Sequence, residues 1–214
     1  MFKFTKYEVR DLIISFLVIS FGFAILYSNR NFSALEFFLP IAMVGVGTGF
    51  ILHEIAHKLS SMHYGYWAEY KLWTSGLIIA LVSSLFGFIF AAPGAVYTYG
   101  TYIDEKQNGI ISLSGPVTNI ILAIIFLILS IIVYISYVPG DIINQILFLT
   151  FSLGFSINSY LATFNLIPIW NLDGSKVLRW NGLVWVTAIA ISGIMTYLSM
   201  FVGTETIIKI LLGI

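Results

Sequence analysis

Long apolar runs separated by short polar connections dominate the chain. The runs that approach the roughly 20 residues needed to cross a bilayer are 11–28, 35–60, 110–137, 142–167 and 183–203. A sixth apolar run, 76–92, is shorter and is interrupted by Ser83, Ser84 and Gly87. It is either a further span or a re-entrant hairpin that enters and leaves the membrane on one side. The pattern predicts an all-α polytopic membrane protein with five to six transmembrane helices.

Two segments beside the shortest apolar run have a different pattern. Residues 67–73 and 95–102 are rich in aromatic and β-branched side chains with partial period-two alternation, which is typical of strands. An aromatic belt at the membrane interface is the alternative interpretation. We expect short membrane-associated β-strands between the second and third spans, within a strand and re-entrant region at 66–109. Residues 1–214 are predicted to form a single membrane-embedded domain.

Composition supports this class and excludes several others. The chain is 59% hydrophobic and 9% charged, against about 25% charged residues in soluble domains. Ten basic residues balance ten acidic ones, so no basic patch points to nucleic acid as a partner. The absence of cysteine excludes disulfides and thiolate metal sites. A composition rich in isoleucine and free of cysteine favours a prokaryotic cell membrane, and the lipid bilayer is the expected surrounding.

Candidate chemistry lies inside the second apolar run. His53, Glu54 and His57 form an HExxH motif, which places two imidazoles on one helical face, where both can bind the same divalent metal. The glutamate between them is positioned to take a proton from metal-bound water. Burying an ionisable group in a membrane costs free energy, so such a group usually has a function there. The motif therefore predicts a metal-dependent hydrolase whose site lies in or beside the bilayer.

A catalytic zinc site needs a third protein ligand. Near the end of the 142–167 run, Pro168 disfavours helical geometry at the residue before it, and the turn at 172–174 then presents the carboxylate of Asp173. His63 is a rival ligand at metzincin spacing, but Ser60 stands where that motif requires glycine. We therefore expect Asp173 to complete the site.

Depth and charge predict the same topology. At 1.5 Å per helical residue, His57 and Asn165 each lie roughly 33 Å along their spans, so they share a membrane level only if the two spans run in the same direction. That requires 76–92 to return without crossing. Eight of the ten basic residues then lie on the cytoplasmic side, as the positive-inside rule expects: Lys3, Lys6, Arg10, Lys58, Lys71, Lys106, Lys176 and Arg179. The active site is accordingly expected towards the cytoplasm.

Three short patterns together resemble the site-2 protease family of intramembrane zinc metalloproteases. They are His53-Glu54-x-x-His57, Gly115-Pro116-x-x-Asn119, and Asn165-x-x-Pro168 followed by Leu172-Asp173-Gly174. The resemblance covers residues 45–180. The chain has room for neither a PDZ nor a CBS module, so it looks like a minimal core of the family. It implies zinc (Zn²⁺) held by His53, His57 and Asp173, with Glu54 as the general base.

The same resemblance implies that Asn165 and Asn119 are polar groups near the substrate carbonyl. Simpler roles are a hydrogen bond between helices for Asn119 and a cap at the loosened helix end for Asn165. The pair at 115–116 is interpreted as the tight beginning of the third span. The expected activity is hydrolysis of peptide bonds within transmembrane protein or peptide substrates.

Other classes share the motif. A membrane metal transporter or sensor would use the same ligands without hydrolysis. A peptidase that trims prenylated C-termini usually takes a distal glutamate from a later span, which this chain lacks, and a pseudoprotease would not need the complete set of ligands and base. Since a helical substrate must unwind before water can attack it, we also expect the strand at 95–102 to pair with the unwound segment.

Overall fold

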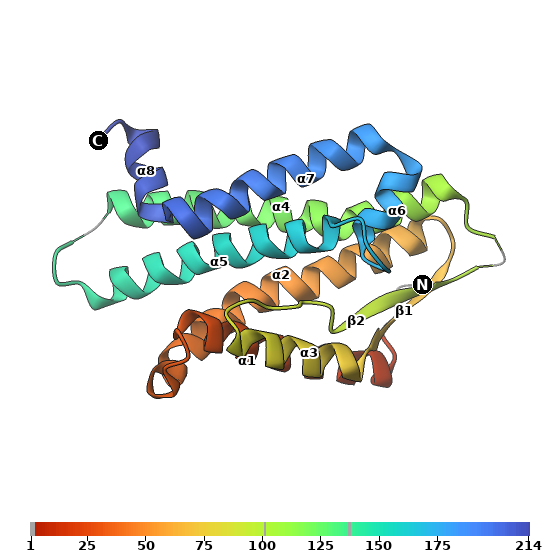
Figure 1. Ribbon diagram of the computed structural model, residues 1–214, viewed down its shortest axis with the longest axis horizontal. Coiled ribbons are helices and arrows are strands. Elements are labelled where there is room, and N and C mark those ends of the chain that lie inside the picture. The colour runs from red at the N-terminus through yellow and green to blue at the C-terminus, as the bar shows by residue number, and fades with distance from the viewer. Residues whose placement is uncertain (1–2, 101, 137) are drawn as a thin grey trace.

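The computed structural model describes residues 3–100, 102–136 and 138–214. It is mostly helical, with one small antiparallel sheet (Figure 1). The elements in chain order are α1 (Lys6–Tyr27), η1 (Phe32–Ala34), α2 (Leu35–His63), β1 (Trp67–Leu72), α3 (Thr74–Leu85), β2 (Gly94–Tyr99), α4 (Glu105–Ile135), α5 (Ile142–Leu166), α6 (Asp173–Trp180), α7 (Gly182–Tyr197), η2 (Leu198–Val202) and α8 (Thr204–Leu212).

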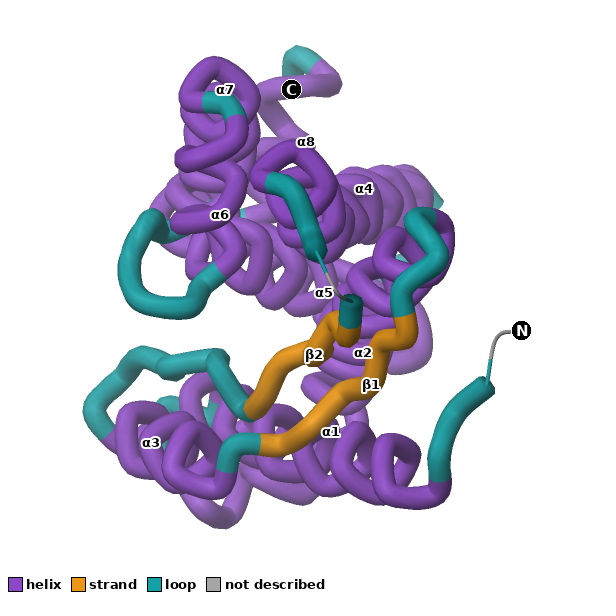
Figure 2. Tube along the Cα trace, turned by 90° about the vertical axis from the view of Figure 1, so that its right-hand side faces the viewer, coloured by secondary structure: helices purple, strands orange, loops and turns teal. Residues whose placement is uncertain are grey.

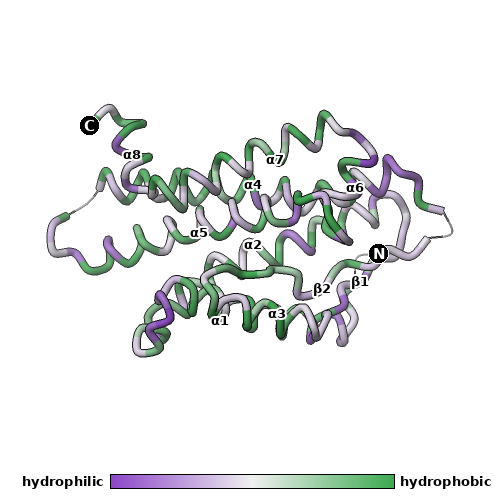
Figure 3. Tube along the Cα trace, in the orientation of Figure 1, coloured by the Kyte–Doolittle hydropathy of each residue, from purple (hydrophilic) through white to green (hydrophobic). Residues whose placement is uncertain are grey.

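Five helical segments of the described chain are long and apolar enough to cross a membrane. They are Lys6–Tyr27, Phe32–His63, Glu105–Ile135, Ile142–Leu166 and Gly182–Val202, and they coincide with the five long apolar runs. Large apolar side chains such as Ile121, Ile128 and Ile132 point outward from α4 and are half exposed, which suits contact with lipid. Strongly hydrophilic residues gather largely at the ends of the long helices (Figure 3). The protein is therefore an integral membrane protein.

Capping chemistry moves two helix boundaries away from the predicted ones. The third span begins at Glu105 because Asp104 forms a capping box with Gln107, so the polar residues before 110 are part of the helix. The first span begins at Lys6 for the same reason, with Thr5 as its cap. By contrast, α5 ends at Leu166 and Ile167 is extended, which confirms the break expected before Pro168. Thr101, inside the predicted strand 95–102, and Tyr137, the predicted end of the third span, lie outside the described residues.

The predicted strands pair with each other. β1 and β2 are antiparallel, with register from Trp67↔Tyr99 to Leu72↔Gly94. Between them, α3 has 12 residues, a length of about 18 Å that is short of the roughly 30 Å hydrocarbon core. The chain then returns, and Trp73 N–H donates to the Pro93 carbonyl at 2.7 Å. The apolar run 76–92 thus leaves and rejoins the same end of the sheet, while its re-entry into the bilayer remains a prediction.

Helix α2 has the central position in this arrangement. It packs against α1 on one side and against α4 and α5 on the other (Figures 1 and 2). Its apolar residues Ala42, Val46 and Phe50 are buried with Phe23 of α1 and Ile157 of α5. The HExxH motif on α2 is therefore held between two groups of elements: α1, α3 and the strands below it in Figure 1, and α4 to α7 above it.

Candidate metal centre

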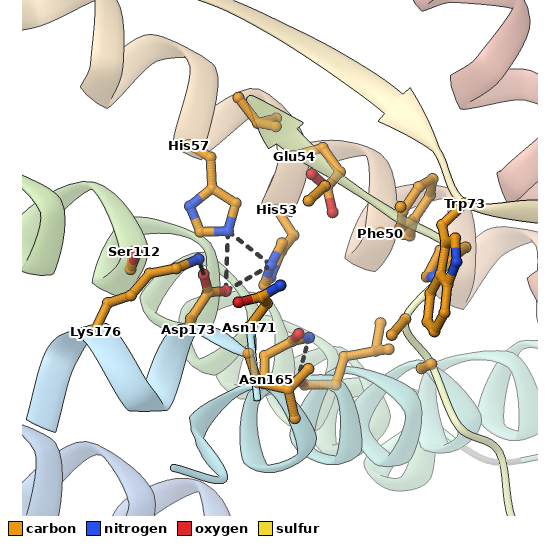
Figure 4. A pocket seen from close by; sticks show the side chains of 18 of the residues that line it. Phe50, His53, Glu54, His57, Trp73, Ser112, Asn165, Asn171, Asp173 and Lys176 are labelled. Carbon is orange, nitrogen blue, oxygen red and sulfur yellow. Dashed lines mark hydrogen bonds and ion pairs between the residues drawn. The ribbon is translucent and has the colours of Figure 1, made fainter. Parts of the chain in front are cut away.

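Three buried side chains converge in the wall of one cavity (Figure 4). The Nε2 atoms of His53 and His57 are 2.9 Å apart. Asp173 Oδ2 lies 3.1 Å from His57 Nε2 and 3.4 Å from His53 Nε2. The two histidines come from consecutive turns of α2, and the aspartate is the first residue of α6. The structure thus brings together the three residues expected to hold a metal.

The outer nitrogens of both imidazoles are occupied by acceptors. His57 Nδ1 lies 2.8 Å from the Ile111 carbonyl oxygen, and His53 Nδ1 lies 2.6 Å from Asn119 Oδ1. Since both partners accept, each Nδ1 carries the proton and each Nε2 lone pair points into the site. Two lone pairs and a carboxylate oxygen directed at one point repel one another unless a cation lies between them. This donor set fits a metal ion.

Asn119 belongs to a buried network of amides. Its Nδ2 donates to the Gly49 carbonyl at 3.0 Å and to Asn158 Oδ1 at 3.1 Å, which turns its own oxygen towards His53. Asn119 and Asn158 are both completely buried. These contacts match the interhelical hydrogen bond considered for Asn119, and they orient a metal ligand. Sequence reasoning missed Asn158, although a polar residue in an apolar span is a recognisable signal.

The pair at 115–116 has a different place from the predicted one. Gly115 lies well inside α4, not at the beginning of the span. A Cβ at this position would lie 2.5 Å from His57 Nε2 and 2.6 Å from His53 Nε2, which is far inside van der Waals contact. Glycine is therefore required for α4 to pass directly beside the two imidazoles. This interpretation corrects the one made from the sequence.

A second close approach positions the aspartate. A Cβ at Gly174 would overlap the backbone of Leu166, so the beginning of α6 rests on the last residue of α5. The connection between them makes a turn in which Trp170 has a positive φ of 54°. The helix break near Pro168 and this packing together bring Asp173 beside the two histidines of α2.

The Asp173 carboxylate has different neighbours on its two oxygens. Oδ2 faces both histidines, while Lys176 Nζ lies 3.7 Å from Oδ1. Burial raises the pKa of this carboxyl, but protonated imidazoles and Lys176 beside it lower the pKa by more. The net direction is a pKa well below the ordinary value, and a cation in place of the imidazole protons favours the same ionised form of Asp173. The sequence analysis counted Lys176 among the cytoplasmic basic residues but did not place it in the site.

Glu54 is next to these ligands and has an unused oxygen. Its side chain is buried, and Oε2 has no hydrogen-bond partner among the described residues. It lines the same cavity of about 360 Å³ as the three ligands. Because an unpaired buried carboxylate oxygen is costly, a water molecule or substrate group in the cavity is needed to satisfy it. A carboxylate oxygen without a protein partner in this cavity is able to accept a proton.

The other residues and segments considered from the sequence lie at different positions relative to the cavity. Asn165 lines the cavity, and its Nδ2 donates to the Leu161 carbonyl at 3.0 Å. His63 is exposed at the end of α2 and is not part of the metal group. A second part of the cavity wall is formed by residues 90–98, which include most of β2.

The chain is similar over nearly its whole length to a curated protein. No family model and no solved structure matches the chain. A protein of Methanocaldococcus jannaschii with the name "Putative zinc metalloprotease MJ0611" is 42% identical over 200 residues, which covers 92% of this chain and 97% of the relative. The chain belongs to this zinc metalloprotease family. With the convergent histidine, histidine and aspartate donors, this relationship identifies zinc as the metal of the site.

Proposed function

We propose that this protein is an intramembrane zinc endopeptidase of the site-2 protease type, which hydrolyses peptide bonds within transmembrane segments of other proteins. The observation that carries the proposal is the position of the site. His53, Glu54 and His57 lie on a helix long and apolar enough to span a membrane, and their cavity is also lined by Phe50 and Leu161 from two spans. A cavity of this kind suits an apolar segment.

The topology supports a site near the cytoplasmic face. The metal ligands lie in the last turns of α2 and just beyond the end of α5, so the two helix ends share one level. The segment between β1 and β2 begins and ends at paired positions, Leu72 and Gly94, which supports a hairpin that enters and leaves on one side. With that hairpin, the distribution of basic residues obeys the positive-inside rule. We infer a prokaryotic cell membrane as its location.

The proposed chemistry divides among a few side chains. Held by His53, His57 and Asp173, zinc would polarise the scissile carbonyl and lower the pKa of the attacking water. Glu54 accepts the proton of the attacking water at its free Oε2 and returns it to the leaving amine nitrogen. Asn165 uses one amide N–H for Leu161 and has a second one for the substrate carbonyl. Asn119 keeps His53 oriented and does not itself contact the substrate.

The edge of β2 is suited to hold an unwound substrate. Tyr70 and Leu72 direct their N–H groups away from β2, so the opposite residue, Val96, also directs its backbone groups away from the pair. Thr98, two residues further along β2, directs its backbone groups to the same side as Val96 because the direction alternates along a strand. Val96 and Thr98 both line the cavity. An extended segment that paired with this edge would lie beside the metal ligands with its peptide bonds accessible.

A cleavage assay with the purified full chain tests the proposal. A synthetic transmembrane peptide is added with the protein in liposomes, and products are identified by mass spectrometry while bound zinc is measured. We expect cleavage within the apolar segment by the wild type, and zinc without cleavage for Glu54→Gln. Cleavage by Glu54→Gln would overturn the mechanism. Zinc transport into the vesicles by Glu54→Gln, with no cleavage by the wild type, would support a transporter instead.

A further inference from the structure

A polar face of α1 runs along β1. Four side chains on this face contact the strand: Thr5 Oγ1 donates to Glu69 Oε1, Glu8 Oε1 accepts from Tyr70 N–H at 3.2 Å, Asp11 Oδ2 accepts from Leu72 N–H at 3.2 Å, and Ser15 Oγ accepts from the Tyr70 hydroxyl at 2.8 Å. Glu8 and Asp11 are buried in a helix that is otherwise largely apolar. The hydrogen bonds to β1 therefore explain why two acidic side chains are buried in this helix.

These contacts close one edge of the two-stranded sheet. The N–H groups of Tyr70 and Leu72 point away from β2, so on a bare strand they would be free to pair with another chain. Carboxylate oxygens of Glu8 and Asp11 occupy both. The edge of β2, at Val96, has no comparable cover among the described residues and faces the cavity. The edge of β1 is thus covered at Tyr70 and Leu72, whereas the edge of β2 at Val96 is open.

Glu8 also joins the strands to the helix that carries the metal ligands. Its Oε2 forms an ion pair with Lys58 Nζ at 2.5 Å, and both side chains are 1% exposed. Lys58 directly follows His57 on α2. One carboxylate therefore contacts the metal-binding helix through one oxygen and the backbone of β1, at Tyr70, through the other. A fully buried ion pair is weak as a source of stability, because desolvation offsets the attraction.

We propose that Glu8, Asp11 and Lys58 are positioning residues that direct substrate to β2 alone and hold β2 at a defined distance from the zinc ligands. They thereby select which peptide bond of the substrate is cut. The inference rests on the proposed protease function and adds the element that determines the cleavage position. A purely structural role for the same residues predicts a change in stability without a change in the bond that is cut.

The first test removes the ion pair without leaving an unpaired charge. In Glu8→Leu with Lys58→Met, we expect bound zinc to stay at the wild-type level. The value of kcat/KM should fall by about 10- to 100-fold, because a displacement near 1 Å can cost about 100-fold. Cleavage should also spread to neighbouring peptide bonds, as read by mass spectrometry. The matched control is Glu205→Leu with Lys209→Met, an exposed pair on α8 at 2.8 Å, which should leave rate and cleavage position unchanged.

The second test uses one residue and its conservative replacement. Asp11→Leu removes the acceptor for Leu72 N–H and should broaden the cleavage position, whereas Asp11→Asn keeps a side-chain oxygen and should restore a single cut. This pair decides the matter even if the double variant does not fold. Cleavage of a single, unchanged bond by Asp11→Leu at the wild-type rate would overturn the inference while leaving the protease function intact. Absence of cleavage by the wild type would overturn the function itself.

Discussion

The two walls of the cavity use their polar groups in opposite ways. On the wall formed by α2, α4 and α6, both nitrogens of each ligand histidine have a partner or face the metal position. On the wall formed by β2, backbone groups at Val96 point into the cavity without a partner in the described chain. The two histidines of the first wall are held by their partners before substrate arrives, and we propose that an extended substrate segment completes the second wall. Changes to the first should therefore affect metal and chemistry, and changes to the second should affect substrate.

The largest effect should come from the ligands themselves. Asp173→Ala and His57→Ala leave two protein ligands, too few for a catalytic zinc site. Loss of a residue that only supports a metal ligand costs up to about 100-fold in metal affinity. We expect the loss of a ligand itself to cost more than this and to abolish cleavage. Metal content after dialysis measures this. His63→Ala is the control, and loss of zinc from that variant alone would show that the ligand set is wrong.

Substitution of Glu54, the proposed general base, should separate chemistry from metal binding. Glu54→Gln keeps the shape of the side chain but cannot accept a proton, so we expect cleavage to fall by about 10² to 10⁴-fold with zinc still bound. Glu36→Gln, an exposed residue at the other end of the same helix, should retain full activity. A Glu54→Gln protein that has lost its zinc would assign this glutamate to the metal and not to proton transfer.

The amide network should have an intermediate effect on the first wall. Asn119→Ala removes the acceptor for His53 Nδ1 and leaves the ring free to rotate, so zinc affinity should fall by about 10- to 100-fold. Competition with a chelator measures the affinity. Asn144→Ala, near the far end of α5, is the control. An unchanged affinity in Asn119→Ala would mean that the Asn119 contact does not help to hold the ring.

The smallest effect should come from the second wall. Val96→Pro removes one N–H from the free edge of β2 and leaves the bonds to β1 in place, which is where proline is tolerated in a strand. One hydrogen bond is worth about 1 kcal/mol, so we expect kcat/KM to fall by about fivefold, mainly through KM. Zinc should be unchanged. A loss of zinc in this variant would contradict the separation of the two walls.

Much of the first wall was predictable because its signals are local. The spacing of His53 and His57 places both on one helical face wherever the helix lies, and Pro168 ends α5 through its own ring geometry. The apolar runs likewise predict five spans by length. The beginning of α4 was predicted too late because a capping box can extend a helix into polar residues. Hydropathy alone does not detect that extension.

The position of the second wall and the contacts that support the metal ligands were harder to predict, because they depend on the packing of segments that are distant in the sequence. The sequence by itself determined the five apolar helices, the pair of histidines and the glutamate beside them, since these follow from covalent spacing and helical periodicity. The meeting of Asp173 with His57 across 116 residues was expected from the sequence, and the structure supplied its geometry. Only the tertiary structure decided that Gly115 lies against both imidazoles and that Glu8 connects Lys58 to β1. These contacts arise from how helices pack, and the same periodic pattern is compatible with many such packings.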